Sequence, residues 1–126
     1  MSDNISISVN ETIQHIQICR ADKMNAFTDD MYQSVATALK KSHKADEIKV
    51  NLISGVPGCF TAGNDISDFY TYAEKGSFSP GIIDFLTTLG TLDMPLILAI
   101  DGPAIGIGTT MAFHADLVYA TPEAIF

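Results

Sequence analysis

Alternation of apolar and polar residues near the N-terminus predicts two half-buried β-strands. Apolar residues occupy every second position from Ile5 to Val9, and a second run of this kind extends from Ile13 to Ile18. The polar pair Asn10-Glu11 separates the two runs, which favours a hairpin. Residues 20–27 show no period, so we expect a loop there.

Two segments have the spacing and end residues of amphipathic helices. Met31, Val35 and Leu39 recur every four residues after Thr28, a residue suited to cap a helix N-terminus. Two aspartates follow Thr28 and three lysines lie near the expected end, as the helix dipole favours. Ser79-Pro80 predicts the start of a second helix, with serine as N-cap and proline as first residue.

The remaining elements alternate in a way that defines the fold class. Strands are predicted at Lys49–Ser54, Pro95–Ile100 and Asp116–Ala120, and a third helix from Gly106 to near His114. The unbroken apolar run Pro95–Ile100 is typical of a strand covered on both faces. Because strands alternate with helices after residue 27, we predict an α/β protein with a largely parallel sheet and right-handed crossovers.

Composition restricts the class of protein further. The 126 residues have the length of one domain, and 47% hydrophobic against 17% charged residues indicate a globular chain. Fifteen acidic and seven basic residues give a net charge of −8, which argues against nucleic acid as a partner. No apolar run is long enough to span a membrane, and the polar N-terminus is unlike a signal peptide. Two cysteines without paired spacing favour reduced thiols, so we expect a cytoplasmic protein.

Two loops of small residues could bind a ligand through their backbone. Phe60–Asp65 and Asp101–Gly108 each follow a predicted strand and open a predicted helix. In parallel sheets, ligands bind at the carboxyl ends of strands, where helix N-termini present unpaired N–H groups. Two such groups aimed at one point would form an oxyanion hole. The alternative for either loop alone is that its glycines only make tight turns.

Other candidate chemistry finds little support in the sequence. His15, His43 and His114 occur in predicted strands or at helix ends, and none pairs with a serine or cysteine at the spacing of a triad. Asp65 and Asp68 with any histidine make a poor metal signature, so no metal is predicted. Neither a dinucleotide fingerprint nor a phosphate loop is present.

Four motifs in collinear order resemble the crotonase family of acyl-CoA enzymes over nearly the whole chain. They are Arg20-x-x-Lys23-x-Asn25-Ala26-Phe27, Gly58-x-Phe60-x-Ala62-Gly63-x-Asp65, the run Pro95 to Gly108, and Asp116-x-Val118-Tyr119-Ala120. The segments Gly58–Ile66 and Gly102–Gly108 are most similar to the Δ3,Δ2-enoyl-CoA isomerase branch. The resemblance implies a crotonase-like α/β fold, a mostly parallel sheet built from ββα repeats. It identifies residues 1–126 as the N-terminal part of the core domain, which looks truncated after Phe126.

The resemblance also implies the roles of individual residues. The backbone N–H groups of Asn64 and Ile107 would grip the thioester carbonyl of an acyl-CoA and stabilise an enolate. The residues implied to hold the CoA ester are Lys23, Ala26, Ala62, Gly63, Asn64, Asp65, Ile66 and Gly106. Coenzyme A is part of the substrate, so no separate cofactor is expected. Family members usually assemble as homotrimers or dimers of trimers.

Aromatic residues between 67 and 90 would wall the acyl pocket of such an enzyme. They are Phe69, Tyr70, Tyr72, Phe78 and Phe85. For the periodic residues of the helix after Pro80, core packing is the preferred interpretation. Residues 71–79 are expected to be a mobile connection between a short amphipathic piece and that helix.

Departures from the family pattern narrow the activity. Thr110 occupies the position of a hydratase glutamate, and threonine has no useful basicity at neutral pH. The single glutamate of the isomerases would lie beyond Phe126. We therefore expect an enoyl-CoA isomerase that converts 3-enoyl-CoA to trans-2-enoyl-CoA. The alternatives are a hydratase-like or thioester-cleaving activity, or a catalytically silent CoA-binding or oligomerisation module.

Overall fold

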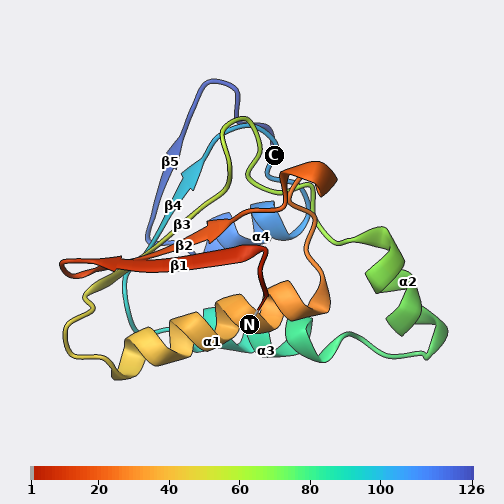
Figure 1. The fold of residues 1–126 in the computed structure, drawn as a ribbon, viewed down its shortest axis with the longest axis horizontal. Helices are drawn as coiled ribbons and strands as arrows, with labels where there is room; N and C mark the ends of the chain where they lie inside the picture. The colour runs from red at the N-terminus through yellow and green to blue at the C-terminus, as the bar shows by residue number, and fades with distance from the viewer. Residues whose placement is uncertain (1) are drawn as a thin grey trace.

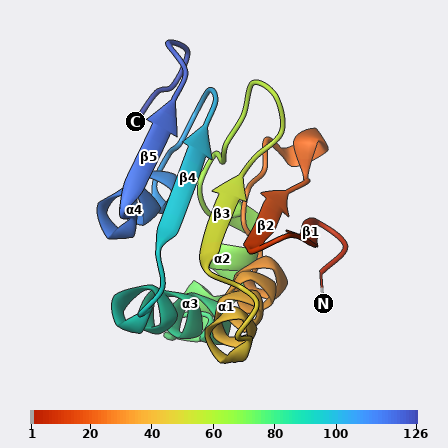
Figure 2. The same cartoon turned by 90° about the vertical axis from the view of Figure 1, so that its left-hand side faces the viewer.

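A five-stranded sheet with helices packed on one face forms the computed structural model, which describes residues 2–126 (Figures 1 and 2). The strands are β1 (Ile5–Asn10), β2 (Ile13–Ile18), β3 (Val50–Ser54), β4 (Leu96–Ile100) and β5 (Leu117–Ala120). The helices are α1 (Asp29–Lys44), α2 (Ile66–Glu74), α3 (Pro80–Thr91) and α4 (Ile107–His114), with a 3-10 turn at Ala21–Lys23.

The sheet has the simple order β1-β2-β3-β4-β5. β1 and β2 form the predicted antiparallel hairpin, and the three other neighbouring pairs are parallel. This confirms the α/β class with a largely parallel sheet. It also places the carboxyl ends of β2, β3, β4 and β5 at one edge, where Figure 2 shows the long connecting loops. Those loops include both small-residue segments singled out above.

The buried face of the sheet follows from register. Ile16, Ile53, Leu98 and Val118 pair across four strands and point to the same side. α1 covers this side with the predicted stripe of Met31, Val35 and Leu39, all of them buried. Removal of this apolar surface from water is the main force that holds α1 on the sheet.

The helix ends follow the predicted capping residues. The Thr28 hydroxyl accepts a hydrogen bond from the Met31 N–H at the start of α1, at 3.4 Å. The Ser79 hydroxyl does the same for the Ile82 N–H at the start of α3, at 3.2 Å. Each cap satisfies one of the N–H groups that a helix start leaves without a partner.

Three aromatic rings pack the loop that precedes α1 against α1 and α3. The ring of Tyr32 lies 4.7 Å from that of Phe27 and 5.3 Å from that of Phe85, centroid to centroid, in tilted arrangements. All three side chains are almost fully buried. The core interpretation of Phe85 is therefore confirmed, and it does not face a pocket.

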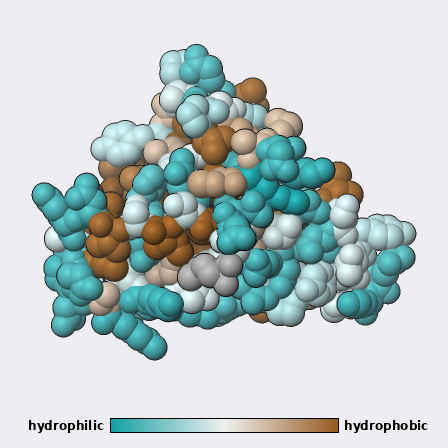
Figure 3. Space-filling model, in the orientation of Figure 1, coloured by the Kyte–Doolittle hydropathy of each residue, from teal (hydrophilic) through white to brown (hydrophobic). Residues whose placement is uncertain are grey.

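The second face of the sheet is less covered than the sequence suggested. Ile97 and Ala99, which alternate with the buried residues of β4, are only half-buried. Among residues 2–126, no helix packs on this face, which Figure 2 presents to the viewer. Figure 3 shows apolar surface over the β1–β2 end of the sheet, and these strands carry the exposed residues Val9 and Ile13. The expectation that β4 is covered on both faces does not hold for the part of the chain described.

The connection between β3 and α3 is more regular than expected. α2 continues to Glu74, so the first part of the segment predicted as a mobile connection is helical. Asp65 caps α2, and its carboxylate accepts a hydrogen bond from the Asp68 N–H at 2.9 Å. α2 contains no buried residue and projects from the body of the molecule in Figure 1. A helix held by its cap and first turn, without a buried stripe, gives little periodic signal in the sequence.

Candidate functional site

The two small-residue loops lie side by side in parallel register. Thr61 and Ala104 form an isolated parallel bridge, and the Ile105 N–H donates to the Thr61 carbonyl at 3.0 Å. Three residues further along each loop, the same register leads to Asn64 and Ile107. The approach requires glycine, because a Cβ on Gly63 would lie 3.3 Å from the Ile105 carbonyl oxygen at a φ of +101°.

Two hydrogen bonds to the backbone of Phe27 fix the peptide groups on either side of the Asn64 Cα. The Phe27 N–H donates to the Gly63 carbonyl at 2.7 Å, and the Asp65 N–H donates to the Phe27 carbonyl at 2.8 Å. In a trans peptide the C=O and N–H point in opposite directions. The Asn64 N–H therefore points away from Phe27, and it donates to no group in the described chain.

The Ile107 N–H is free for a different reason. Ile107 is the first residue of α4, so its N–H has no carbonyl one turn earlier within the helix. The Gly106 carbonyl accepts from the Thr110 N–H at 3.1 Å, which directs the Ile107 N–H out of the helix start. Gly106 reaches this geometry with a φ of +58°. Within residues 2–126, the Ile107 N–H likewise donates to no group.

An apolar cavity of about 230 Å³ adjoins Asn64. Its walls come from α1, α2, α3 and the connection between the last two. The aromatic and aliphatic residues that line it are Phe27, Tyr32, Phe69, Tyr72, Ala73, Phe78 and Ile82. Phe69, Tyr72 and Phe78, three of the five aromatic residues predicted to wall an acyl pocket, thus line one cavity, whereas Tyr70 is exposed and lies outside the lining.

A second hollow, of about 300 Å³, also adjoins Asn64. It brings together six of the eight residues that the resemblance implied for the CoA ester. They are Lys23, Ala26, Ala62, Asn64, Asp65 and Ile66. The other two, Gly63 and Gly106, stand between the loops, where a Cβ on Gly106 would lie 3.7 Å from the Gly63 Cα. Asn64 and Asp65 line both hollows, so the two spaces meet at the loop that carries the first free N–H.

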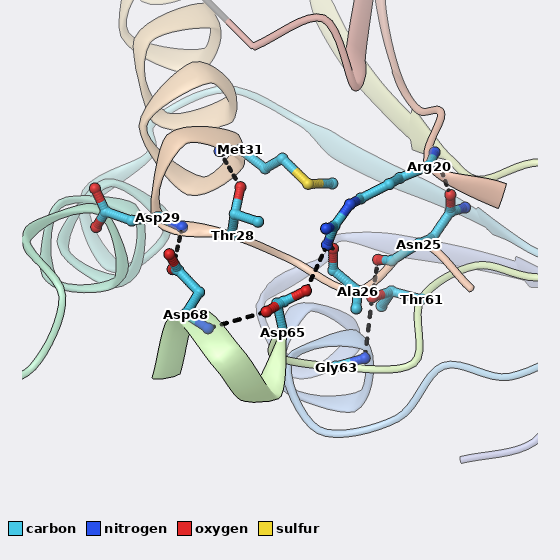
Figure 4. A network of polar contacts seen from close by, with 10 residues as sticks. All are labelled: Arg20, Asn25, Ala26, Thr28, Asp29, Met31, Thr61, Gly63, Asp65 and Asp68. Carbon is cyan, nitrogen blue, oxygen red and sulfur yellow. Dashed lines mark hydrogen bonds and ion pairs between the residues drawn. The ribbon is translucent and has the colours of Figure 1, made fainter. Parts of the chain in front are cut away.

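Carboxylates tie the helix starts around the cavity together (Figure 4). Arg20 donates from Nη1 to Asp65 Oδ2 at 2.8 Å and to the Ala26 carbonyl at 2.9 Å. Asp68 Oδ2 in turn accepts the Asp29 N–H at the start of α1, at 2.7 Å. Asp65 thus braces the start of α2 against Arg20, and Asp68 links α2 to the start of α1.

Asn25, to which the sequence analysis gave no role of its own, holds the loop Phe60–Asp65 in place. Its Nδ2 donates to the Cys59 and Phe60 carbonyls at 3.1 Å each, and its carbonyl accepts the Thr61 hydroxyl at 2.7 Å. Thr61 Oγ1 then accepts the Gly63 N–H at 3.1 Å, as Figure 4 shows. Asn25 has a φ of +57°, which asparagine tolerates better than most residues. An asparagine in an aperiodic loop was the available signal.

Tyr32 is the second functional candidate that sequence reasoning missed. Its hydroxyl donates to Asn64 Oδ1 at the wall of the apolar cavity, although the residue as a whole is buried. Burial raises the pKa of the Tyr32 hydroxyl far above its usual range, so it remains a neutral hydrogen-bond donor. Next to Met31 in a helical pattern, Tyr32 gave no sign of a role beyond packing.

Other polar groups do not converge on this place. His15 Nε2 and Ser54 Oγ form a hydrogen bond of 2.7 Å on the less covered face of the sheet, away from both loops. Thr110 donates its hydroxyl to the Gly106 carbonyl of its own helix at 3.3 Å. Over residues 2–126 no group of three or more potential metal ligands is found. In the same range, no helix has the length and hydropathy needed to cross a membrane.

Protonation of Asp65 should destabilise the protein at low pH. The hydrogen bond from the Asp68 N–H, together with that from Arg20, lowers the pKa of Asp65 below its usual value. A carboxylate with a lowered pKa in the folded state contributes stability above its unfolded pKa, and that contribution is lost as the pH falls through the folded pKa. We expect the stability difference between the protein and its Asp65→Asn variant to shrink below about pH 4, measured by urea unfolding.

Asparagine is chosen for this variant because its side chain can still cap the start of α2. The exposed Asp3→Asn serves as control, and a difference that is independent of pH would contradict the assignment.

Comparison with known proteins places the chain in a family. Residues 8–126 match the family described as enoyl-CoA hydratase/isomerase. Enoyl-CoA delta isomerase 2 of Rattus norvegicus is 30% identical over 130 residues, which cover 99% of this chain and 33% of the relative. The probable enoyl-CoA hydratase echA6 of Mycobacterium leprae is 30% identical, over 97% of this chain and 49% of the relative.

A solved structure shows the same fold. Pseudomonas aeruginosa OdaA superposes with a TM-score of 0.90 at 36% identity, covering 98% of this chain and 49% of OdaA. The architecture is thus the crotonase fold that the motifs predicted. The chain belongs to the enoyl-CoA hydratase/isomerase family, and it spans between a third and a half of the length of these relatives.

Proposed function

We propose that this chain forms the substrate-binding site and the oxyanion hole of an acyl-CoA enzyme, specifically an enoyl-CoA isomerase. The observation that carries the proposal is the pair of free backbone N–H groups, Asn64 and Ile107, on loops held in parallel register. An apolar cavity suited to an acyl chain and the hollow lined by Lys23 both adjoin Asn64. A thioester carbonyl placed between the two spaces would meet both donors.

The proposed reaction uses these donors when negative charge develops. Removal of a proton from C2 of a 3-enoyl-CoA leaves an electron pair that is delocalised onto the thioester oxygen. The two N–H groups donate to that oxygen, and loss of one such donor typically costs about 3–4 kcal/mol of transition-state stabilisation. Return of a proton to C4 moves the double bond to position 2. We assign the proton transfer to a glutamate outside these residues.

The rest of the CoA ester is assigned to the hollow beside the first loop. Ala26 and Ala62 offer small side chains that let the pantetheine arm approach the backbone, and Ile66 adds an apolar contact. Lys23 supplies the cation for a CoA phosphate. Gly63, Asp65 and Gly106 shape and brace the loops on which the arm would lie. We further propose that the protein assembles as a homotrimer or a dimer of trimers, as the family resemblance implies.

The second candidate is a hydratase, because a relative of equal identity is described as a probable enoyl-CoA hydratase. Thr110, at the position where hydratases of the family carry a glutamate, favours the isomerase. Its hydroxyl is occupied by the Gly106 carbonyl of its own helix and cannot act as a base. A catalytically silent CoA-binding module is the third candidate.

Spectrophotometry of the full-length gene product separates the three candidates. An isomerase increases ultraviolet absorbance when given a 3-enoyl-CoA, because the product's double bond is conjugated with the thioester. A hydratase instead decreases the absorbance of a trans-2-enoyl-CoA. Binding of an acyl-CoA in calorimetry without either change would identify the silent module and overturn the proposal.

A further inference from the structure

The hydrogen bond from the Tyr32 hydroxyl to the Asn64 side chain is not needed for packing of the tyrosine ring in the core. The aromatic rings of Phe27 and Phe85 hold the Tyr32 ring from two sides, so the direction of its hydroxyl is fixed. That hydroxyl reaches the cavity wall and donates to Asn64 Oδ1. In the described chain this is the one hydrogen bond that the Asn64 side chain makes.

The two backbone hydrogen bonds that flank Asn64 both involve one residue, Phe27. Phe27 bonds the carbonyl before Asn64 and the N–H after it, both through its own backbone. These bonds fix one edge of the loop but leave the exposed Asn64 side chain free to rotate toward the open cavity. The Tyr32 hydroxyl adds a third point of attachment, on α1. Three attachments define the orientation of the Asn64 residue and hence the direction of its N–H.

We propose that Tyr32 is a positioning residue that aims the Asn64 N–H at the thioester oxygen by holding the Asn64 side chain. The proposal rests on the proposed function, because it assigns the Asn64 N–H to the oxyanion hole. It goes beyond that function in tying the performance of a backbone donor to a side chain on a different element. Neutral tyrosine suits the role, since its hydroxyl can donate to the carboxamide oxygen over the whole physiological pH range.

The test uses Tyr32→Phe in the full-length gene product, which removes one oxygen and keeps the ring. Loss of a partly buried hydrogen bond that orients a catalytic donor is expected to lower kcat about tenfold, with KM unchanged. A conjugated probe, cinnamoyl-CoA, gives a second readout, because polarisation of its carbonyl shifts its absorbance to longer wavelength. We expect the bound probe to shift less in Tyr32→Phe than in the unmodified protein.

Tyr119→Phe is the matched control. It makes the same chemical change on β5, where Tyr119 is 62% exposed and lies outside both hollows. We expect it to change neither kcat nor the probe shift. If Tyr32→Phe lowers the melting temperature but leaves kcat and the probe shift unchanged, its hydroxyl only supports packing and the inference is wrong.

A double variant tests the route through Asn64. In an Asn64→Ala background the Tyr32 hydroxyl has no side chain to hold, so adding Tyr32→Phe should reduce kcat no further. An additional tenfold loss there would show that Tyr32 acts by another route and would overturn the inference. The proposed function is judged separately from the unmodified protein. If that protein neither turns over a 3-enoyl-CoA nor shifts the probe, the function and the inference fail together.

Discussion

Replacing Ile107 with proline is expected to lower kcat on a 3-enoyl-CoA about 10²- to 10³-fold, as removal of one oxyanion donor does in other enzymes. Proline has no N–H, so the substitution deletes the proposed second donor outright. The carbonyl oxygen of the bound thioester would then be stabilised by the Asn64 N–H alone. Because the deleted interaction strengthens as charge develops on the oxygen, kcat should fall and KM should change little.

The fold should tolerate this substitution, which makes the result interpretable. Ile107 is the first residue of α4, a position where proline is favoured. Gly106, the residue before it, has φ 58° and ψ −111°. These angles are the mirror image of the extended conformation that a residue before proline prefers. Because glycine adopts both conformations equally well, proline at position 107 should not strain Gly106. Ile107→Ala is the control, because it removes the side chain and keeps the N–H. Full activity in a correctly folded Ile107→Pro variant would exclude Ile107 from the oxyanion hole.

Local sequence signals were sufficient for most of the fold. Thr28 and Ser79 mark the starts of α1 and α3 because capping depends on residues only three positions apart. The hairpin of β1 and β2 follows in the same way from alternation and a short polar turn. These features are decided within a few residues, so a single sequence displays them.

The features that were missed depend on contacts between distant segments. Tyr32 meets Asn64 across 32 positions of the chain, and Asp68 meets Asp29 across 39. Neither contact leaves a period or a motif, so Tyr32 was indistinguishable from a packing residue and Asp68 from a solvated one. The coverage of β4 was missed for the same reason. Its apolar run shows that the strand is hydrophobic, but it does not show which elements cover each face of the sheet.

The proposed oxyanion donors could be named from sequence because they are backbone groups set by glycines. Gly63 and Gly106 adopt positive φ, and this requirement leaves a visible residue type at each loop. The resemblance to the crotonase family then gave the positions that follow them. A side chain that supports such a donor without an unusual backbone conformation, as Tyr32 does, leaves no comparable mark, which explains why the contact of Tyr32 came only from the structure.

Replacing Gly102 with alanine is expected to have the largest effect on stability, lowering the free energy of unfolding by about 3–5 kcal/mol. A Cβ at this position would lie 2.1 Å from the Gly58 carbonyl oxygen, and the φ of +77° disfavours any side chain. The neighbouring Asp101 carboxylate accepts the Gly58 N–H at 2.7 Å, so the loops after β3 and β4 are locked together here. Relief of the overlap must move one loop away from the other.

Because the same two loops carry Asn64 and Ile107, the loss of stability in Gly102→Ala should be accompanied by weaker acyl-CoA binding. Urea unfolding of the full-length gene product measures the first effect, and calorimetric titration with an acyl-CoA measures the second. Gly90→Ala is the matched control: it lies within α3, a Cβ there meets no atom within 4 Å, and alanine should stabilise the helix by about 0.5–1 kcal/mol. If Gly102→Ala were as stable as Gly90→Ala, the close approach of the two loops would not be what holds the site together.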